Sequence, residues 1–364
     1  MPSNKYKNTK IKFIKMRFTI REYKKFNKKT YDSFLMAGDI GGTNTSLGIF
    51  GVKNNPALLV SFHFKSRELR ALHDAVNEAL AYSKDNYKIN ITKACFAVAG
   101  VLSANGDYAQ ITNAKWDASR KILLKKTNLK KIALINDFEA VGYGINTLAK
   151  KDVMAIKKAK PTPKAPILVI GAGTGLGKTT LVYDRHQKAY KPIPSEAGHS
   201  DFAAQSKLDF ELVDFIRKRK KAKSVSYEQV LSGQGLGNIY LFLRKNKKFK
   251  AAKYTKEIDK SKSKPELISK YRKADKTCKE TFEIFKIAYA GFAKNMALDG
   301  LALGGVYIAG GIAPKNREIF DKSFVKIFEE SLKMGHILKR MPIYLILNYD
   351  VGLLGAGFAG SRLL

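Results

Sequence analysis

The chain has 364 residues, of which 45% are hydrophobic, and its 67 basic and 31 acidic residues give a net charge of +36. This hydrophobic content supports a buried core in one large domain or two ordinary ones, and it excludes an intrinsically disordered chain. No apolar run reaches the roughly 20 residues that a bilayer-spanning helix needs, so we expect no membrane span. Cys95 and Cys278 are too few for a disulfide framework or a four-cysteine zinc site, which favours a reducing compartment and a cytoplasmic protein.

The beginning of the chain is strongly basic. Residues 1–30 contain eleven Lys or Arg and a single acid, Glu22. They lack the features of a signal or transit peptide, and we interpret residues 1–35 as a basic N-terminal extension. The basicity continues through the rest of the chain, where a lysine-rich proteome is the simplest explanation. Nucleic acid and polyphosphate are the alternative partners for such a surface.

From residue 34 the pattern alternates between strands and helices. The apolar run 34–37 leads into GDIGGTN at 38–44, and residues 45–52 then read as a second strand. This is a strand, a glycine turn and a strand. Apolar residues at helical spacing then predict an amphipathic helix over 67–83.

The middle of the chain continues this alternation. We expect strands at 94–99 and 132–135, followed by helical spacing over 138–149. The stretch KKAKPTPKAP at 157–166 contains three prolines and four lysines, and it cannot continue a helix or supply ladder donors. We interpret it as a surface loop near a domain junction.

A second glycine hairpin follows this loop. Residues 166–184, PILVIGAGTGLGKTTLVYD, again read as a strand, a turn and a strand. GGTNTSLGIF at 41–50 and GLGKTTLVYD at 175–184 share Gly, Thr and Leu at matching positions, which suggests a duplicated fold in which one hairpin opens each half. A ligand would then lie between the halves.

Residues 172–179, AGTGLGKT, also match a loose form of the phosphate-binding P-loop motif. That motif needs a helix directly after its lysine and threonine, because the helix N-terminus binds the phosphates. Residues 179–183 are instead β-branched, aromatic or leucine, and they predict a strand. A glycine hairpin can still bind phosphate through its backbone amides.

Polar side chains are concentrated in the loops that follow these strands. Asn136 and Asp137 end an apolar strand, at the edge where ligands bind in open α/β sheets. Glu196, His199 and Glu228 lie in polar segments bounded by glycine. Taken alone, Asp137 could equally cap a helix that starts at Phe138. Together with the two hairpins, these residues suggest a nucleotide on one side and a polyol on the other.

The chain resembles the bacterial-type glucokinases, the hexokinases of the actin-like ATPase superfamily. Eight strings carry this resemblance in family order, from residue 37 to the end of the chain: GDIGGTNTSLGIF, ITNAKW, ALINDFEAVGYGI, GAGTGLG, SEAGHSDF, VLSGQGLGNIY, GVYIAGGIAP and GLLGAGFAG. The resemblance implies an α/β protein with the two-domain actin-like (ribonuclease H-like) fold around a central cleft. It implies a small domain over 36–147 that is completed by 350–364, a large domain over 148–349, and a homodimer.

The resemblance also assigns an activity, the transfer of the γ-phosphoryl group of ATP to the 6-hydroxyl of glucose in the first step of glycolysis. Asp137 would be the catalytic base and Asn136 would fix the neighbouring hydroxyl, while the other sugar-binding residues would be Asn113, Glu196, His199 and Glu228. Asp39 would hold hydrated Mg²⁺. The nucleotide would be bound by Asp39, Gly41, Gly42, Thr43, Asn44, Gly173, Thr174, Gly175, Gly310 and Gly311.

Two residues depart from the family pattern. Ala197 stands where the family usually has glycine, and its methyl group is tolerable unless the backbone there needs a positive φ. Lys178 is an unexpected cation beside the second turn. Two other classes of protein therefore stay open: a non-catalytic or regulatory protein on the same scaffold, and a P-loop ATPase that uses Lys178.

Overall fold

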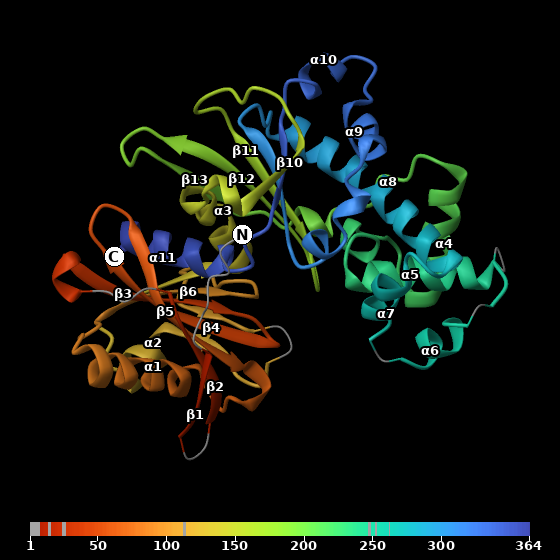
Figure 1. Ribbon diagram of the computed structural model, residues 1–364. Coiled ribbons are helices and arrows are strands. Elements are labelled where there is room, and N and C mark those ends of the chain that lie inside the picture. The colour runs from red at the N-terminus through yellow and green to blue at the C-terminus, as the bar shows by residue number, and fades with distance from the viewer. Residues whose placement is uncertain are drawn as a thin grey trace. The chain divides into compact units, whose positions relative to one another are not determined.

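The computed structural model describes residues 8–13, 16–23, 27–111, 114–246, 249–251, 253–261 and 263–364. The chain divides into two compact units, which we describe separately (Figure 1). The first unit consists of Met1–Ala149, Gln187–Pro192 and Asp350–Leu364, and the second of Lys150–His186 and Ile193–Tyr349.

The first unit contains a seven-stranded sheet in the order β1-β2-β5-β4-β3-β6-β9. Its strands are β1 (Asn8–Phe13), β2 (Met16–Glu22), β3 (Ser33–Ile40), β4 (Asn44–Val52), β5 (Pro56–Lys65), β6 (Lys93–Val98) and β9 (Lys131–Asn136). The pairs β3–β4 and β4–β5 are antiparallel, and β3, β6 and β9 run parallel. A small hairpin of β7 (Tyr108–Ala109) and β8 (Ala118–Ser119) accompanies the sheet.

Helices cover both faces of this sheet (Figure 1). One face packs on α1 (Leu72–Tyr87) and α2 (Arg120–Lys126), the other on α3 (Asp137–Gly144) and α11 (Val351–Leu363). The predicted helix over 67–83 therefore starts later than expected. Leu69 is buried as its periodicity predicted, but it has extended backbone dihedrals at the end of a short 3₁₀ turn, Ser66–Glu68.

Helices α3 and α11 pack without intervening side chains. A Cβ atom at Gly355 would lie 1.8 Å from the carbonyl oxygen of Ala140, and one at Gly144 would lie 2.5 Å from that of Val351. Only glycine allows the two backbones to approach this closely. These contacts place the end of α3 against the start of α11, and each helix has an acidic residue at its start, Asp137 in α3 and Asp350 as the N-cap of α11.

A second sheet has six strands in the order β10-β15-β14-β11-β12-β13, and it belongs to the second unit except for residues 189–192 of β13, which are counted with the first. Its strands are β10 (Val153–Lys157), β11 (Ile167–Ala172), β12 (Leu176–Asp184), β13 (Ala189–Ile193), β14 (Gly305–Ala309) and β15 (Ile343–Ile346). β11 pairs antiparallel with β12 and parallel with β14, which is parallel to β15. In the first unit β3 has the same relation to β4, β6 and β9, so the duplication expected from the two hairpins is present in the topology.

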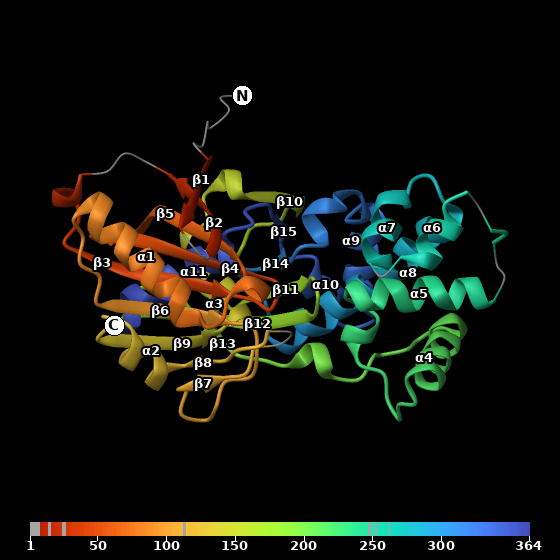
Figure 2. The ribbon, with the colours of Figure 1, turned by 90° about the horizontal axis from the view of Figure 1, so that it is seen from below.

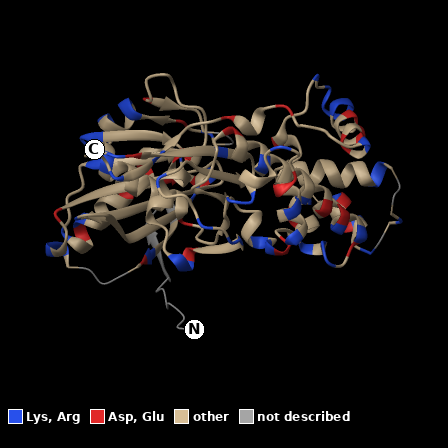
Figure 3. Ribbon diagram, turned by 90° about the horizontal axis from the view of Figure 1, so that it is seen from above, with Lys and Arg blue, Asp and Glu red and all other residues tan. Residues whose placement is uncertain are grey.

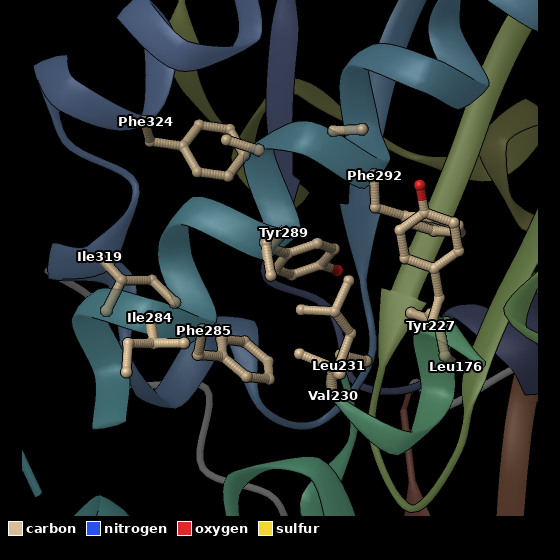
Figure 4. Packing of buried hydrophobic residues seen from close by; sticks show 14 of the residues in the cluster. Leu176, Tyr227, Val230, Leu231, Ile284, Phe285, Tyr289, Phe292, Ile319 and Phe324 are labelled. Carbon is tan, nitrogen blue, oxygen red and sulfur yellow. The ribbon is translucent and has the colours of Figure 1, made fainter. Parts of the chain in front are cut away.

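The helices of the second unit are α4 (Lys207–Lys220), α5 (Gly233–Lys245), α6 (Thr255–Lys260), α7 (Lys264–Tyr271), α8 (Lys276–Asp299), α9 (Lys322–Glu329) and α10 (Gly335–Leu338). The first five gather in one group (Figure 2). Tyr289 of α8 packs edge-on against Phe285 and Phe324 in the core of this unit (Figure 4). Leu176 and Tyr227 belong to the same cluster, so the loops beside them rest on a close-packed core.

The basic residues are spread over the surface of both units (Figure 3). Residues 217–221 form one exposed basic run, of which the first four lie in the last turn of α4 and the fifth, Lys221, is its C-cap. None of the helices in the described part of the chain is both long and apolar enough to cross a bilayer.

Candidate active site

The turn between β3 and β4 is held by the segment that follows β5. The backbone N–H of Gly41 donates to the carbonyl oxygen of Asn44 over 3.0 Å, and that of Ser66 donates to the carbonyl oxygen of Thr43 over 3.0 Å. The Ser66 hydroxyl donates to the carbonyl oxygen of Gly41. The Lys65 ammonium donates to Asn44 Oδ1 over 2.8 Å. The turn, with Gly42 at its tip, is therefore fixed in shape while Thr43 and Asn44 are exposed.

The junction of β9 and α3 positions the Asn-Asp pair. Asn136 is the N-cap of α3, and its side-chain oxygen accepts hydrogen bonds from the backbone N–H groups of Phe138 and Glu139. Its amide nitrogen lies 3.5 Å from the carbonyl oxygen of Gly100. The interpretation of Asp137 as the cap was wrong, because Asn136 takes that role. Asp137 is the first residue of the helix and is half-buried.

Three carboxylates lie near one another in the first unit. Asp39 is next to last in β3, and burial together with the charges of Asp137 and Asp350 raises its pKa to about 6. Asp350 is the N-cap residue of α11. A Cβ atom at Gly352 would lie only 2.9 Å from Asp39 Oδ2, so the carboxylate faces the first turn of α11.

In the second unit, the turn between β11 and β12 meets two other segments. The backbone N–H of Gly233, the first residue of α5, donates to the carbonyl oxygen of Gly173 over 2.8 Å. The backbone N–H of Leu176 donates to Glu228 Oε2 over 2.9 Å. A Cβ atom at Gly175 would lie 2.6 Å from the same oxygen. Glu228 is thus seated on the turn formed by residues 173–175, which includes Thr174.

The segment after β14 reaches the same turn. Gly310 has a φ of +85°, and a Cβ atom there would lie 2.4 Å from the carbonyl oxygen of Ala172. The N–H of Ile312 donates to that oxygen over 3.2 Å. Gly311 has open space where a side chain would stand, with no heavy atom of the described residues within 4 Å. The structure therefore brings Gly310 and Gly311 beside the turn.

Glu196 and His199 lie on one short 3₁₀ turn, where His199 Nε2 is 3.8 Å from Glu196 Oε2. Both side chains are more than 60% exposed. Backbone hydrogen bonds join this segment to the one that carries Glu228, through Ser200 and Tyr227 over 3.0 Å. The three predicted sugar-binding residues of this unit therefore lie on adjoining segments.

Ala197 is compatible with this turn, since its φ is not positive. A Cβ atom at Gly198, in contrast, would lie 2.0 Å from the carbonyl oxygen of Leu176. Glycine is thus needed at the second position of this pair and not at the first. Asn113 lies outside the described residues.

Three residues that the structure brings to these segments were not predicted from the sequence: Gly233, Asp350 and Gly352. The N-terminus of α5 could have been found from Ser232, since serine before a glycine-rich helical run is a common N-cap. No local signal marks Asp350, because its proximity to Asp39 depends on contacts distant in the sequence.

Comparison with known proteins gives a consistent result. The glucokinase family model matches residues 36–362. A glucokinase from Nostoc sp. is 36% identical over 351 aligned positions, which cover 91% of this chain and all of the relative. The chain belongs to the glucokinase family. Its members are ATP-dependent hexose kinases.

Solved structures agree with this assignment. The glucokinase from an Antarctic psychrotroph superposes with a TM-score of 0.76 at 26% identity, covering 91% of this chain and 99% of that one. The glucokinase from Balamuthia mandrillaris, solved with glucose, gives a TM-score of 0.73 at 20% identity, over 90% and 94% of the two chains. The fold is that of the actin-like ATPases, as the sequence indicated.

The alternative of a P-loop ATPase is wrong, because no helix follows the glycine turn. Lys178 lies within β12, where it pairs with Ile170 of β11. Its side chain is 10% exposed, and its ammonium nitrogen lies 3.4 Å from Asp299 Oδ2 at the end of α8. A strand cannot supply the aligned amides of a helix N-terminus. Lys178 therefore serves as a half of an ion pair.

We expect Lys178→Met to keep glucokinase activity within about threefold, since methionine retains most of the apolar stem. Phosphorylation of glucose at saturating ATP would measure this. In a P-loop the lysine reaches the β- and γ-phosphates. A loss of several orders of magnitude in kcat, with the melting temperature unchanged, would contradict the ion-pair role.

Proposed function

We propose that the protein transfers the γ-phosphoryl group of ATP to the 6-hydroxyl of D-glucose, with Asp137 as the base. The hydroxyl oxygen attacks phosphorus, the bond between phosphorus and the bridging oxygen of ADP breaks, and Asp137 takes the hydroxyl proton. The products are glucose 6-phosphate and ADP. Phosphoryl transfer depends chiefly on positioning and charge stabilisation, for which one well-placed carboxylate is enough.

One observation carries this proposal. Asp137 begins α3 directly after the cap residue Asn136, so its carboxylate is fixed at the carboxyl edge of the parallel strands. It is half-buried, and its charge acts on Asp39 at the end of β3. Asp137, the proposed base, and Asp39, the proposed partner of hydrated Mg²⁺, are therefore held at the same edge of the first sheet.

The proposed sugar-binding residues are polar side chains that neighbouring segments bring together. Glu196, His199 and Glu228 present two carboxylates and an imidazole from adjoining segments of the second unit. Asn136 retains an amide group beside Asp137, and Asn113 completes the set expected from the family. Each carboxylate accepts hydrogen bonds from two hydroxyls, and an epimer with a misplaced hydroxyl leaves such a group unpaired.

The nucleotide is proposed to bind the two glycine turns. The first is Gly41, Gly42, Thr43 and Asn44, and the second is Gly173, Thr174 and Gly175 beside the N-terminus of α5. Backbone amides in tight turns and at a helix N-terminus attract phosphate. The open space at Gly311 and the close approach of Gly310 to Ala172 suit a flat purine ring.

The residues present fit a hydrated magnesium ion. The chain has no group of three or more metal-binding side chains among its described residues, so a cage made of protein alone is not available there. Mg²⁺ instead binds kinases through one or two carboxylates, water and the phosphates of the substrate. Asp39 would hold it through water, and the cation would relieve the repulsion among Asp39, Asp137 and Asp350.

A coupled assay tests the proposal. Glucose, mannose, fructose and N-acetylglucosamine are each offered with ATP, ADP or polyphosphate. We expect glucose with ATP to give the highest kcat/KM. Preference for another pair would correct the substrate, and absence of transfer in all combinations would reject the proposal.

Gly175→Ala should damage sugar binding. The new methyl group would lie 2.6 Å from Glu228 Oε2, too close for both to stay in place, and this flexible carboxylate moves more easily than the backbone. Loss of a hydrogen bond to a charged group costs about 1.5–3 kcal/mol, so the KM for glucose should rise roughly tenfold or more. Initial rates over a range of glucose concentrations measure it.

The control is Gly237→Ala in α5, where no atom of the described residues lies within 4 Å of the added methyl. It should leave the KM for glucose and the KM for ATP unchanged. In a Glu228→Ala background, Gly175→Ala should add little, because the displaced group is already gone. Equal effects in both backgrounds would show that Gly175 acts elsewhere.

The proposal also covers the cellular location of the protein and its assembly. A cytoplasmic homodimer is what the family resemblance suggests, and the buried free thiols of Cys95 and Cys278 suit a reducing compartment. The exposed basic run 217–221 is the candidate surface for nucleic acid or polyphosphate. Retention on an anionic column that falls with salt would test that surface.

A further inference from the structure

The N-terminal segment adds a strand to the first unit from outside the glucokinase family match. That match begins at residue 36, whereas β2 covers Met16–Glu22 and pairs antiparallel with β5. The pairing continues past the strand, since the backbone N–H of Tyr23 donates to the carbonyl oxygen of Leu59 over 3.0 Å. Part of the segment interpreted as a basic extension is therefore integral to the sheet that carries Asp39.

Tyr23 joins this added strand to the start of the last helix. Its hydroxyl donates to Asp350 Oδ2 over 3.1 Å and lies 3.3 Å from the hydroxyl oxygen of Ser61. Burial, followed by the charge of Asp350, raises the pKa of Tyr23 to about 12. The phenol is thus a neutral donor throughout the range in which kinases work.

Tyr23 lies near one end of a series of side chains that are joined by hydrogen bonds. Ser61 Oγ lies 2.8 Å from His63 Nε2, and His63 Nδ1 lies 3.0 Å from Ser46 Oγ. Since the phenol has one proton and gives it to Asp350, Ser61 donates to the phenol oxygen, His63 Nε2–H donates to Ser61, and Ser46 donates to Nδ1. Burial lowers the pKa of His63, which favours the neutral ring that this order requires.

Both ends of this series lie beside Asp39. Ser46 is directly opposite Asp39 in the register of β3 and β4. Asp350 is the N-cap residue of α11, and its carboxylate accepts the hydrogen bond from Tyr23. The first turn of α11 rests against Asp39 at Gly352. Tyr23 therefore contacts a carboxylate whose charge acts on Asp39.

We propose that Tyr23 is a positioning residue for the kinase reaction, which holds Asp350 away from Asp39 so that Asp39 is left to the Mg·ATP complex. This inference rests on the proposed function. Without the phenol hydroxyl, Asp350 loses a donor, and its carboxylate turns toward the cation and the phosphates. The loss of the hydroxyl therefore weakens nucleotide binding and leaves sugar binding unchanged.

The test compares two tyrosines near the end of β2, namely Tyr23, which follows the strand, and Tyr87, which hydrogen-bonds to it from α1. Tyr23→Phe should raise the KM for Mg·ATP about three- to tenfold, with kcat changed less than about twofold and the KM for glucose unchanged. Tyr87→Phe is the matched control, because Tyr87 of α1 donates to Glu22, the last residue of β2. It should change none of these constants. An unchanged KM for Mg·ATP in Tyr23→Phe, or an equal rise in Tyr87→Phe, would overturn the proposal.

A second comparison shows whether Tyr23 acts through Asp350. In an Asp350→Ala background, Tyr23→Phe should raise the KM for Mg·ATP no further. An equal rise in both backgrounds would overturn the assignment. Calorimetric titration of each variant with ADP and Mg²⁺ is independent of turnover. A weaker affinity confined to Tyr23→Phe supports the proposal even if glucose is not the substrate, and equal affinities reject it.

Discussion

Asp137→Asn should lower kcat about 10²- to 10⁴-fold, the usual contribution of a positioned general base. Asparagine keeps the size of the side chain and its place at the start of α3, next to the cap residue Asn136. It cannot accept the hydroxyl proton as the sugar attacks. Coupled measurement of ADP release at saturating glucose and ATP gives kcat directly.

Glucose binding should survive this change within a few fold. The single tryptophan, Trp116, lies three residues after Asn113, so its fluorescence can follow sugar binding. Asp137→Glu keeps the charge but moves the oxygens by one methylene, and we expect a smaller loss of kcat than for asparagine. Turnover of Asp137→Asn within tenfold of the wild type would contradict the role of the carboxylate.

Asp39→Asn should have opposite effects on activity and on stability. The carboxylate is close to two others, and its pKa of about 6 exceeds the ordinary value of 3.8. The folded state therefore holds the proton more tightly than the unfolded state, and its stability falls as pH rises from about 4 to above 6. The shift corresponds to about 3 kcal/mol, so the free energy of unfolding of Asp39→Asn should exceed that of the wild type by up to this amount at pH 8.

The kinase activity of Asp39→Asn, in contrast, should fall. Asparagine at residue 39 cannot offset the charge of hydrated Mg²⁺, and groups that act through metal-bound water usually change metal affinity or activity about 10- to 100-fold. We expect such a loss in kcat/KM for Mg·ATP.

Urea titrations at pH 4 and pH 8, in buffer free of metal and nucleotide, measure the stability part. The difference between variant and wild type should be near zero at pH 4 and appear at pH 8. Asp85→Asn, an exposed change on α1, should show no difference at either pH. A loss of stability in Asp39→Asn at pH 8 would contradict the account of three repelling carboxylates.

The repeated topology could be predicted from sequence because its signals are local. Each glycine turn lies between two apolar strands, and the β-branched run after Lys178 distinguishes a hairpin from a P-loop without any tertiary information. The acid at the end of β9 was found in the same way. Its exact helical position was missed by one residue, because asparagine and aspartate are almost equally good caps.

The rest of the site depends on contacts between distant segments. Asp350 approaches Asp39 only because glycines let α11 pack closely on α3. Tyr23 reaches Asp350 only because β2 pairs with β5, and nothing in a lysine-rich segment predicts that pairing. Glu228 was assigned from family resemblance, but its contact with Gly175 could be found only from the three-dimensional structure.

The most direct test of the central claim is the stoichiometry of the reaction of the unmodified chain with ATP, Mg²⁺ and glucose. Phosphorus NMR can follow ATP, ADP, inorganic phosphate and sugar phosphate together. We predict one glucose 6-phosphate for each ADP, and almost no ADP when glucose is left out. Release of ADP and inorganic phosphate at the same rate with and without glucose would contradict the account.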